Sequence, residues 1–190
     1  MSSWGKLVRG AVLAAGAVVL VAGCSSGDAE PEASGPTSTS PTIAPEAPTA
    51  FDGCKLPESV MQSEGFLDRS TPTDQKGADG IRWTGCLWVV SNGYSANFAT
   101  TNITVDMVRA NKKWAVYQEL TVDGRPALTY HDAAKTDMTT DCMMNVEMKG
   151  GSMEISIDNP PSGSKTGDTP ACDVATRLAE QLVPTIPADA

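Results

Sequence analysis

The most regular alternation of apolar and polar residues in this chain lies between positions 142 and 157. Apolar side chains occupy every second position on each side of Gly150-Gly151, at Met144, Val146, Met148, Met153, Ile155 and Ile157. A period of two is typical of a strand with one buried face, and paired glycines suit the tight turn of a hairpin. The pattern therefore predicts a β-hairpin over 142–157.

Other runs with strand character precede this hairpin. Residues 82–90 carry apolar side chains on both faces of an extended chain, which predicts a strand covered on both sides, with a bulge at Gly85. Three further strands are expected, the last two joined by a turn, over 94–98, 114–122 and 127–131. Most of these strands are expected to pair antiparallel, because short turns connect them.

Helix signals lie near both ends of this strand-rich region. Residues 57–65 begin with a proline suited to a first helical position and end with a glycine. A short helix is expected over 104–113, capped by its first residue. Thr169 as N-cap and Pro170 precede an apolar stripe at Val174, Ala175, Leu178, Ala179 and Leu182. Together the elements predict an α+β fold: a mostly antiparallel sheet with N- and C-terminal helices packed on one face, a two-layer α/β sandwich.

The first 23 residues have the pattern of an export signal. Lys6 and Arg9 precede an apolar run over 11–22, as in a secretory signal peptide. Such a run reaches roughly 18 Å as a helix, too short for a hydrocarbon core of ~30 Å. The sequence Val21-Ala22-Gly23-Cys24 resembles the lipobox of bacterial lipoproteins, in which the cysteine becomes the mature N-terminus and its sulfur is bonded to diacylglycerol.

We therefore expect residues 1–23 to be removed and Cys24 to carry acyl chains such as palmitate. Two or three chains hold a protein stably on a membrane, so the expected location is the extracytoplasmic face of the cell membrane. Residues 25–50 contain five Pro, five Ser and four Thr but one large apolar residue, Ile43. We expect residues 24–50 to form a disordered tether and residues 51–190 to form a single globular domain.

The charge of the chain argues against two classes of partner. There are 23 Asp and Glu against 14 Lys and Arg, a formal net charge of −9. Nucleic-acid binders need basic patches that displace phosphate counterions, and electrostatic docking on anionic lipid also needs basic clusters. We expect no nucleic-acid partner, and contact with the membrane through the lipid on Cys24.

Four further cysteines remain in the expected domain: Cys54, Cys86, Cys142 and Cys172. An even number in an exported domain predicts two disulfides. The spacing leaves all three pairings open. We favour Cys86–Cys142, which would join the entries of two strands, and Cys54–Cys172, which would close most of the domain.

The order of these landmarks is similar to that of a known family. A lipobox and a Ser/Thr/Pro tether are followed by Cys86-Leu87-Trp88 at a strand start, by the segment 122–127 with sequence VDGRPA, and by Pro170-Ala171-Cys172 at the last helix. This order resembles an actinobacterial lipoprotein family known as domain of unknown function 3558, over about residues 51–187. The resemblance implies an exported location, disulfide bonding and an α/β sandwich, and it supplies no catalytic residues.

Two groups of side chains are candidates for chemistry. His131 is the only histidine, with Asp132 beside it, but there is no Gly-x-Ser-x-Gly nucleophile motif. Five methionines fall close together, and thioethers are soft ligands for Cu(I): Met138, Met143, Met144, Met148 and Met153. Their alternation favours core packing instead.

The sequence thus predicts no catalytic, cofactor or metal site. The favoured function is a non-enzymatic binding or accessory module at the cell envelope, whose partner is an envelope protein, a cell-wall glycan or a small apolar ligand. The alternatives are a hydrolase of envelope material that uses His131 and a copper-binding protein that uses the methionines of 138–153.

Overall fold

A computed structural model describes residues 42–135, 137 and 139–190. The expected signal peptide, Cys24, most of the expected tether and Met138 lie outside the described residues. In the described part of the chain, no helix is both long and apolar enough to cross a membrane.

An antiparallel sheet of eight strands forms the middle of the fold. Its order is β1-β3-β4-β8-β7-β6-β5, and β2 also pairs with β3. The strands are β1 (Thr71–Pro72), β2 (Gln75–Lys76), β3 (Arg82–Val89), β4 (Ser95–Thr101), β5 (Trp114–Val122), β6 (Arg125–Asp132), β7 (Asp141–Met148) and β8 (Gly151–Asp158). The predicted hairpin is confirmed as β7 and β8, at the centre of the sheet.

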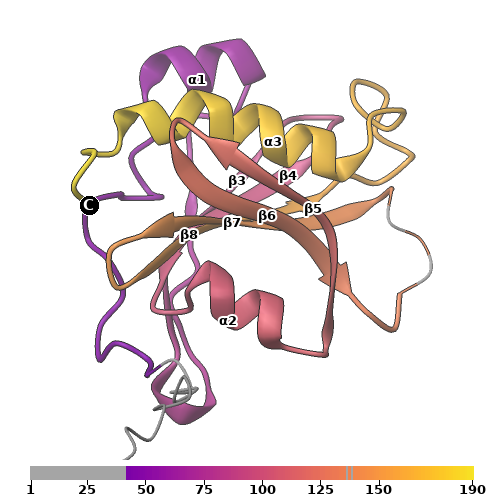
Figure 1. Cartoon of the computed structure of the whole chain (residues 1–190). Helices are drawn as coiled ribbons and strands as arrows, with labels where there is room; N and C mark the ends of the chain where they lie inside the picture. The colour runs from indigo at the N-terminus through magenta and orange to yellow at the C-terminus, as the bar shows by residue number, and fades with distance from the viewer. Residues whose placement is uncertain (1–41, 136, 138) are drawn as a thin grey trace, which may run out of the picture. The chain divides into compact units, whose positions relative to one another are not determined.

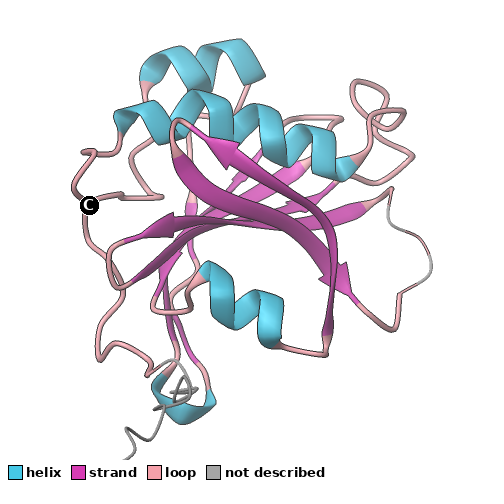
Figure 2. Ribbon diagram, viewed as in Figure 1, coloured by secondary structure: helices cyan, strands magenta, loops and turns pink. Residues whose placement is uncertain are grey.

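The helices lie on both faces of this sheet, unequally. Figure 1 shows α1 (Glu58–Glu64) and α3 (Ala171–Leu182) together on one face and α2 (Val105–Ala110) alone on the other. Two 3-10 turns complete the elements, η1 (Ala78–Gly80) and η2 (Val183–Thr185). The predicted packing of N- and C-terminal helices on one face is confirmed, as Figure 2 also shows.

Several element ends differ from the predictions. The α2 helix ends at Ala110, because Asn111 leaves helical geometry and its carbonyl accepts the Trp114 N–H as the chain turns into β5. The predicted cap is confirmed, since Thr104 Oγ1 accepts the Met107 N–H at 3.2 Å. Gly85 forms no bulge: its register with Ala99 is regular, and the bulge of the sheet lies in β5 between positions 116 and 118.

The main core lies between the sheet and the pair α1 and α3. The predicted stripe of α3 is confirmed, since Val174, Ala175, Leu178, Ala179 and Leu182 are all fully buried. The alternating apolar positions of the hairpin meet this stripe from β7 and β8, where Met144, Val146, Met148, Met153 and Ile155 have exposures of at most 1%. Burial of these side chains is the main stabilising contribution, at about 25 cal/mol per Å² of apolar surface.

The chain before the domain also contacts the sheet. Asn102, at the end of β4, donates to the Ala44 carbonyl at 2.7 Å, and Arg82 Nε donates to the Pro45 carbonyl at 3.2 Å. Arg82 Nε also lies 3.6 Å from a carboxylate oxygen of Glu46. The expected disorder of the tether therefore does not extend over residues 44–46.

The favoured disulfide pairing is wrong. The bonds are Cys54–Cys86 and Cys142–Cys172, with sequence separations of 32 and 30. Cys86 lies on β3 and Cys142 on β7, with β4 and β8 between them. Strands are ~4.8 Å apart, so these two residues are about 14 Å apart, whereas bonded cysteines need Cα atoms within ~7 Å.

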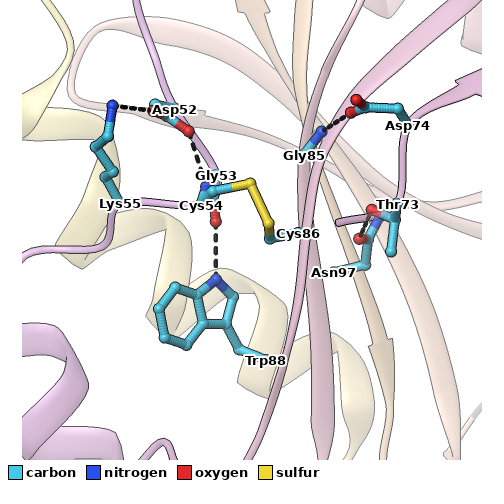
Figure 3. The surroundings of a disulfide bond; sticks show 10 residues. All are labelled: Asp52, Gly53, Cys54, Lys55, Thr73, Asp74, Gly85, Cys86, Trp88 and Asn97. Atoms are coloured by element: carbon cyan, nitrogen blue, oxygen red, sulfur yellow. Dashed lines mark hydrogen bonds and ion pairs between the residues drawn. A yellow bond between two sulfur atoms is a disulfide. The ribbon is translucent and has the colours of Figure 1, made fainter. Parts of the chain in front are cut away.

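The first disulfide fixes the segment before α1 onto β3 (Figure 3). Beside the bond, Trp88 Nε1 donates to the Gly53 carbonyl at 2.8 Å. Gly53 lies so close to β4 that a Cβ there would be 2.0 Å from the Phe98 carbonyl oxygen. A glycine is therefore required for this close approach.

The second disulfide joins the first turn of α3 to the start of β7, so we expect its loss to be costly. The double variant Cys142→Ala/Cys172→Ala should lose about 3–4 kcal/mol of unfolding free energy, the chain-entropy value for a loop of 30 residues. Urea denaturation of the oxidised proteins measures this.

Peptide mapping of the disulfides provides the control for that measurement. The four cysteines fall on different tryptic peptides, so a non-reduced digest should contain the cross-linked pairs 54–86 and 142–172. A peptide that links Cys86 to Cys142 would contradict the structure.

A largely buried carboxylate joins α1 to α3. Glu64 accepts hydrogen bonds from Arg177 Nη2 at 2.9 Å, from Gln181 Nε2 at 2.6 Å and from the Tyr94 hydroxyl at 2.8 Å. The side chain of Glu64 is 8% exposed and that of Arg177 is 42% exposed. Burial acts to raise the pKa of Glu64, but the hydrogen bonds from Arg177, Gln181 and Tyr94 and the charge of Arg177 together lower it below its ordinary value of 4.5.

We therefore predict an acid-sensitive contribution to stability from this carboxylate. A group with a lowered folded-state pKa stabilises the fold above its unfolded-state pKa, and the contribution disappears as pH falls through the folded-state value. At pH 7 Glu64→Gln should lose about 1–2 kcal/mol, because half-exposed Arg177 limits the effect. Its stability should also change less than that of the parent as the pH is lowered below 4.5.

Denaturation between pH 7 and pH 3 checks this, with Glu58→Gln as the matched control in the same helix. Glu58 is exposed and accepts only a local bond from Gln62 in the described chain. Equal losses in both variants would show that the Glu64 contacts contribute nothing specific.

Candidate functional site

The face of the sheet that carries α2 has its own small apolar cluster. Val105 and Val108 of α2 pack with Leu128 and Tyr130 of β6, and partly buried Ile103, Trp114 and Met143 extend the cluster. Because α2 has six residues, it covers only part of this face.

A cavity of about 200 Å³ lies beside α2 on this face. It is bounded by side chains from β3 to β8, from α2 and from the segment around β1 and β2: Thr73, Gln75, Trp83, Asn97, Ile103, Val108, Trp114, Tyr130, Met143 and Glu154. The strand period of two explains this arrangement. Met143 and Glu154 are the hairpin positions that face away from α3.

A chain of hydrogen bonds forms the polar wall of the cavity. Trp83 Nε1 donates to Glu154 Oε2 at 3.2 Å, and the Tyr130 hydroxyl lies 3.5 Å from the same oxygen. The Tyr130 hydroxyl also lies 2.8 Å from Asn145 Oδ1. The chain continues from Asn145 Nδ2 to Ser152 Oγ at 2.6 Å and from there to the Ile103 carbonyl at 2.6 Å.

This chain constrains where the protons lie. A phenol has one proton to donate, and the shorter contact directs the proton of Tyr130 to Asn145 Oδ1. The phenol oxygen can then accept a proton from Glu154 whenever that carboxyl is neutral. When Glu154 is charged, its contact with Tyr130 therefore carries no proton, and Trp83 is the donor to the carboxylate in this chain.

Glu154 is the one acidic residue of this wall. Burial raises the pKa of Glu154, and hydrogen bonds from Trp83 and Asn145 oppose that rise. Burial also raises the pKa of Tyr130 well above 10, so its hydroxyl stays protonated. In the described ranges, no Lys, Arg or His borders the cavity, and no ion pair involves Glu154. The carboxyl thus has hydrogen-bond donors but no counter-charge.

The structure does not assemble catalytic groups around His131. The side chain is buried at 6% exposure, and within residues 42–135, 137 and 139–190 its Nδ1 has no hydrogen-bond partner. Asp132 is exposed, and its Oδ1 accepts the Ala134 N–H at 2.9 Å. Because neighbouring residues of a strand face opposite sides, Asp132 is not placed to orient the imidazole as a catalytic acid–base pair requires.

The methionines fall on opposite faces of the sheet. Met144, Met148 and Met153 belong to the core under α3, so the prediction of core packing is confirmed for them. Met143 belongs to the cluster under α2 and borders the cavity. The sheet separates its sulfur from those of the other three, and these four methionines do not form one copper site. Met138 lies outside the described residues.

Glu154 and its neighbours do not stand out as a site in the sequence. Glu154 stands between apolar Met153 and Ile155, a pattern typical of a solvent-facing position. Trp83 and Trp114 looked like ordinary strand residues. The one available signal is that Trp83, Trp114 and Tyr130 are aromatic residues in strands with polar neighbours in sequence. This pattern indicates that the second face of the sheet is also partly apolar.

Comparison with known proteins identifies the family of this chain. No curated protein and no solved structure shows significant similarity to it. A family model described as a protein of unknown function, DUF3558, matches residues 19–185. This match spans most of the chain, including all four disulfide-bonded cysteines, and the protein therefore belongs to the DUF3558 family of proteins of unknown function.

Proposed function

We propose that this protein is a lipid-anchored binding module of the cell envelope, which takes a small ligand in the cavity beside α2. The observation that carries the proposal is the cavity itself, with an acidic group and aromatic side chains on one wall. Small-molecule sites are typically concave, mostly apolar and furnished with a few placed polar groups.

The hydrogen bonds of the polar groups at the cavity favour a binding function over a catalytic one. Asn145, Ser152 and Tyr130 are hydrogen-bonded to one another and to the backbone. A buried polar network that satisfies itself is rigid. Such a network holds a binding surface in shape, whereas acid–base catalysis needs a group free to exchange a proton with the substrate.

The membrane anchor rests on the N-terminal pattern. Gly23 and Cys24 directly follow an apolar run of signal-peptide length that ends in Val21-Ala22, and the cysteine thiol is the group that a diacylglycerol thioether requires. The Pro- and Ser-rich residues that follow would place the domain away from the lipid surface on the outer side of the cell membrane.

The anchor predicts a defined N-terminal modification. Mass spectrometry of the protein from its native membrane should find Cys24 as the first residue, with a mass increase for diacylglycerol and a fatty acid. Cys24→Ala should leave the membrane fraction, because the acyl chains hold the protein there. Ser26→Ala is the matched control and should stay membrane-bound, whereas an unmodified Cys24 sulfur in the membrane-bound protein would refute the anchor.

If the cavity is the ligand site, a substitution that fills it should abolish ligand binding. Ligand-observed NMR with small fragments of mixed charge should detect binders of the parent protein. Met143→Trp places an indole in the cavity. The affinity of the fragments should fall more than tenfold, so that their NMR binding signals disappear. Val116→Trp adds the same group on the exposed edge strand β5, where the parent residue is 37% exposed, and should leave binding unchanged.

Both variants should keep the parent circular dichroism spectrum and melting temperature within a few degrees. Fragments that bind Met143→Trp as well as they bind the parent would show that this cavity is not the ligand site.

A further inference from the structure

The side chains that line the cavity favour a positively charged ligand. Three aromatic side chains, Trp83, Trp114 and Tyr130, border it together with the carboxyl group of Glu154. Aromatic faces attract cations through their quadrupole, and rings grouped around one site are the usual means of holding quaternary ammonium groups. Since no basic side chain borders the cavity in the described ranges, nothing in this wall opposes a positive ligand.

The aromatic and acidic groups are held close to one another. The rings of Trp114 and Tyr130 meet edge to face, with centroids 5.4 Å apart. The indole N–H of Trp83 is bonded to Glu154 at 3.2 Å, which fixes that ring beside the carboxyl group. An ammonium group in the cavity would therefore meet a counter-charge and aromatic surface together.

On these grounds we infer that the cavity binds an organic ammonium cation, with Glu154 as its counter-charge and Trp83, Trp114 and Tyr130 as its aromatic wall. This inference rests on the proposed binding function and names its ligand class. At about 200 Å³, the cavity is smaller than the sites of drug-sized ligands, which have ~300–1,000 Å³. It suits a single alkylammonium group, either free or at the end of a longer molecule.

Other ligand classes fit less well. An anion would meet the carboxyl group without a basic partner. A hard metal ion such as Ca²⁺ needs six or more oxygen ligands, and no cluster of three or more His, Cys, Asp or Glu that could hold a metal exists in the described part of the chain. A neutral sugar needs several open hydrogen-bonding groups, but Thr73 and Asn97 of the wall are bonded to each other at 2.6 Å.

Protonation of Glu154 should be coupled to binding. Burial raises the pKa of Glu154 in the free protein, and a bound cation would lower it, so the cation competes with a proton. Affinity should therefore rise as pH increases through the free-protein value. Tyr130 on β6 stays protonated across this range.

Several other charged groups on this face are bonded, including Asp141 on β7, which pairs with Lys135 at 2.8 Å. Glu147 on β7 accepts the Val105 N–H at 3.0 Å, and its pKa is raised by burial. On α2, Arg109 is paired with Asp106 and with Glu119 of β5.

The test uses choline and its neutral isostere 3,3-dimethyl-1-butanol as probes, titrated calorimetrically into the full chain in a non-ionic detergent. Choline should bind at least tenfold more tightly than the alcohol at pH 7.5, and its affinity should decrease at pH 5. Glu154→Gln should weaken the binding of choline at least tenfold and leave the affinity for the alcohol unchanged. The amide oxygen of glutamine can still accept from Trp83, so the variant should remain folded.

Glu180→Gln is the matched control, because it removes one exposed acid from α3 on the other face of the sheet and should not affect choline. Glycerophosphocholine as a third probe separates two sources of such a cation. Binding as tight as that of choline supports a lipid headgroup, and weaker binding supports a free amine.

Equal affinity for choline and the alcohol would overturn the inference but leave the binding function standing, provided that Met143→Trp abolishes both. Absence of choline binding, with fragments of other charge still bound, would also overturn it. If no fragment and no probe binds, the proposed function fails as well.

Discussion

Burial of the apolar stripe of α3 against the central hairpin is the contact on which the rest of the structure depends. Val174, Leu178 and Leu182 have no exposed surface and meet β7 and β8 at the middle of the sheet. The Cys142–Cys172 bond fixes the first turn of this helix to β7, and Arg177 connects it to Glu64 of α1. The helix thus joins the strands, the second disulfide and α1 into one unit.

The opposite face of the same strands differs in the polarity and the closure of its packing. Under α3 the interior is apolar and closed, whereas under α2 the sheet carries aromatic and polar side chains around a cavity. The short α2 explains the difference, because a helix of six residues shields too little surface to close that face. The polar groups left there bond to one another, as partly buried groups must.

Local patterns were enough to predict much of the fold. The hairpin, the stripe of α3, the glycine at the end of α1 and the Thr104 cap all depend on residues near one another in the chain, and each was confirmed. The cysteine pairing could not be predicted, because it depends on β4 and β8 lying between Cys86 and Cys142. Strand order is a property of the whole sheet, and spacing along the chain does not contain it.

The cavity was missed for a related reason. Glu154 alternates with buried apolar residues like any solvent-facing residue of a strand, and its partners Trp83 and Tyr130 come from strands distant in sequence. No local pattern distinguishes a carboxylate that faces water from one that faces an indole. The signal peptide and the lipidation of Cys24 remain predictions from a local sequence pattern, because residues 1–41 lie outside the described part of the structure.

The strict alternation of the β7–β8 hairpin has a consequence for how such a domain can diversify. Each side chain at an even position of β7, such as Met144 or Val146, meets the interior, while Met143 and Asn145 face the cavity side. Substitutions at Met143 therefore change the lining of the cavity without altering the contacts of the strand with α3. Interleaved but separate sets of residues thus specify the packing of the core and the lining of the cavity, so that one can vary while the other is kept.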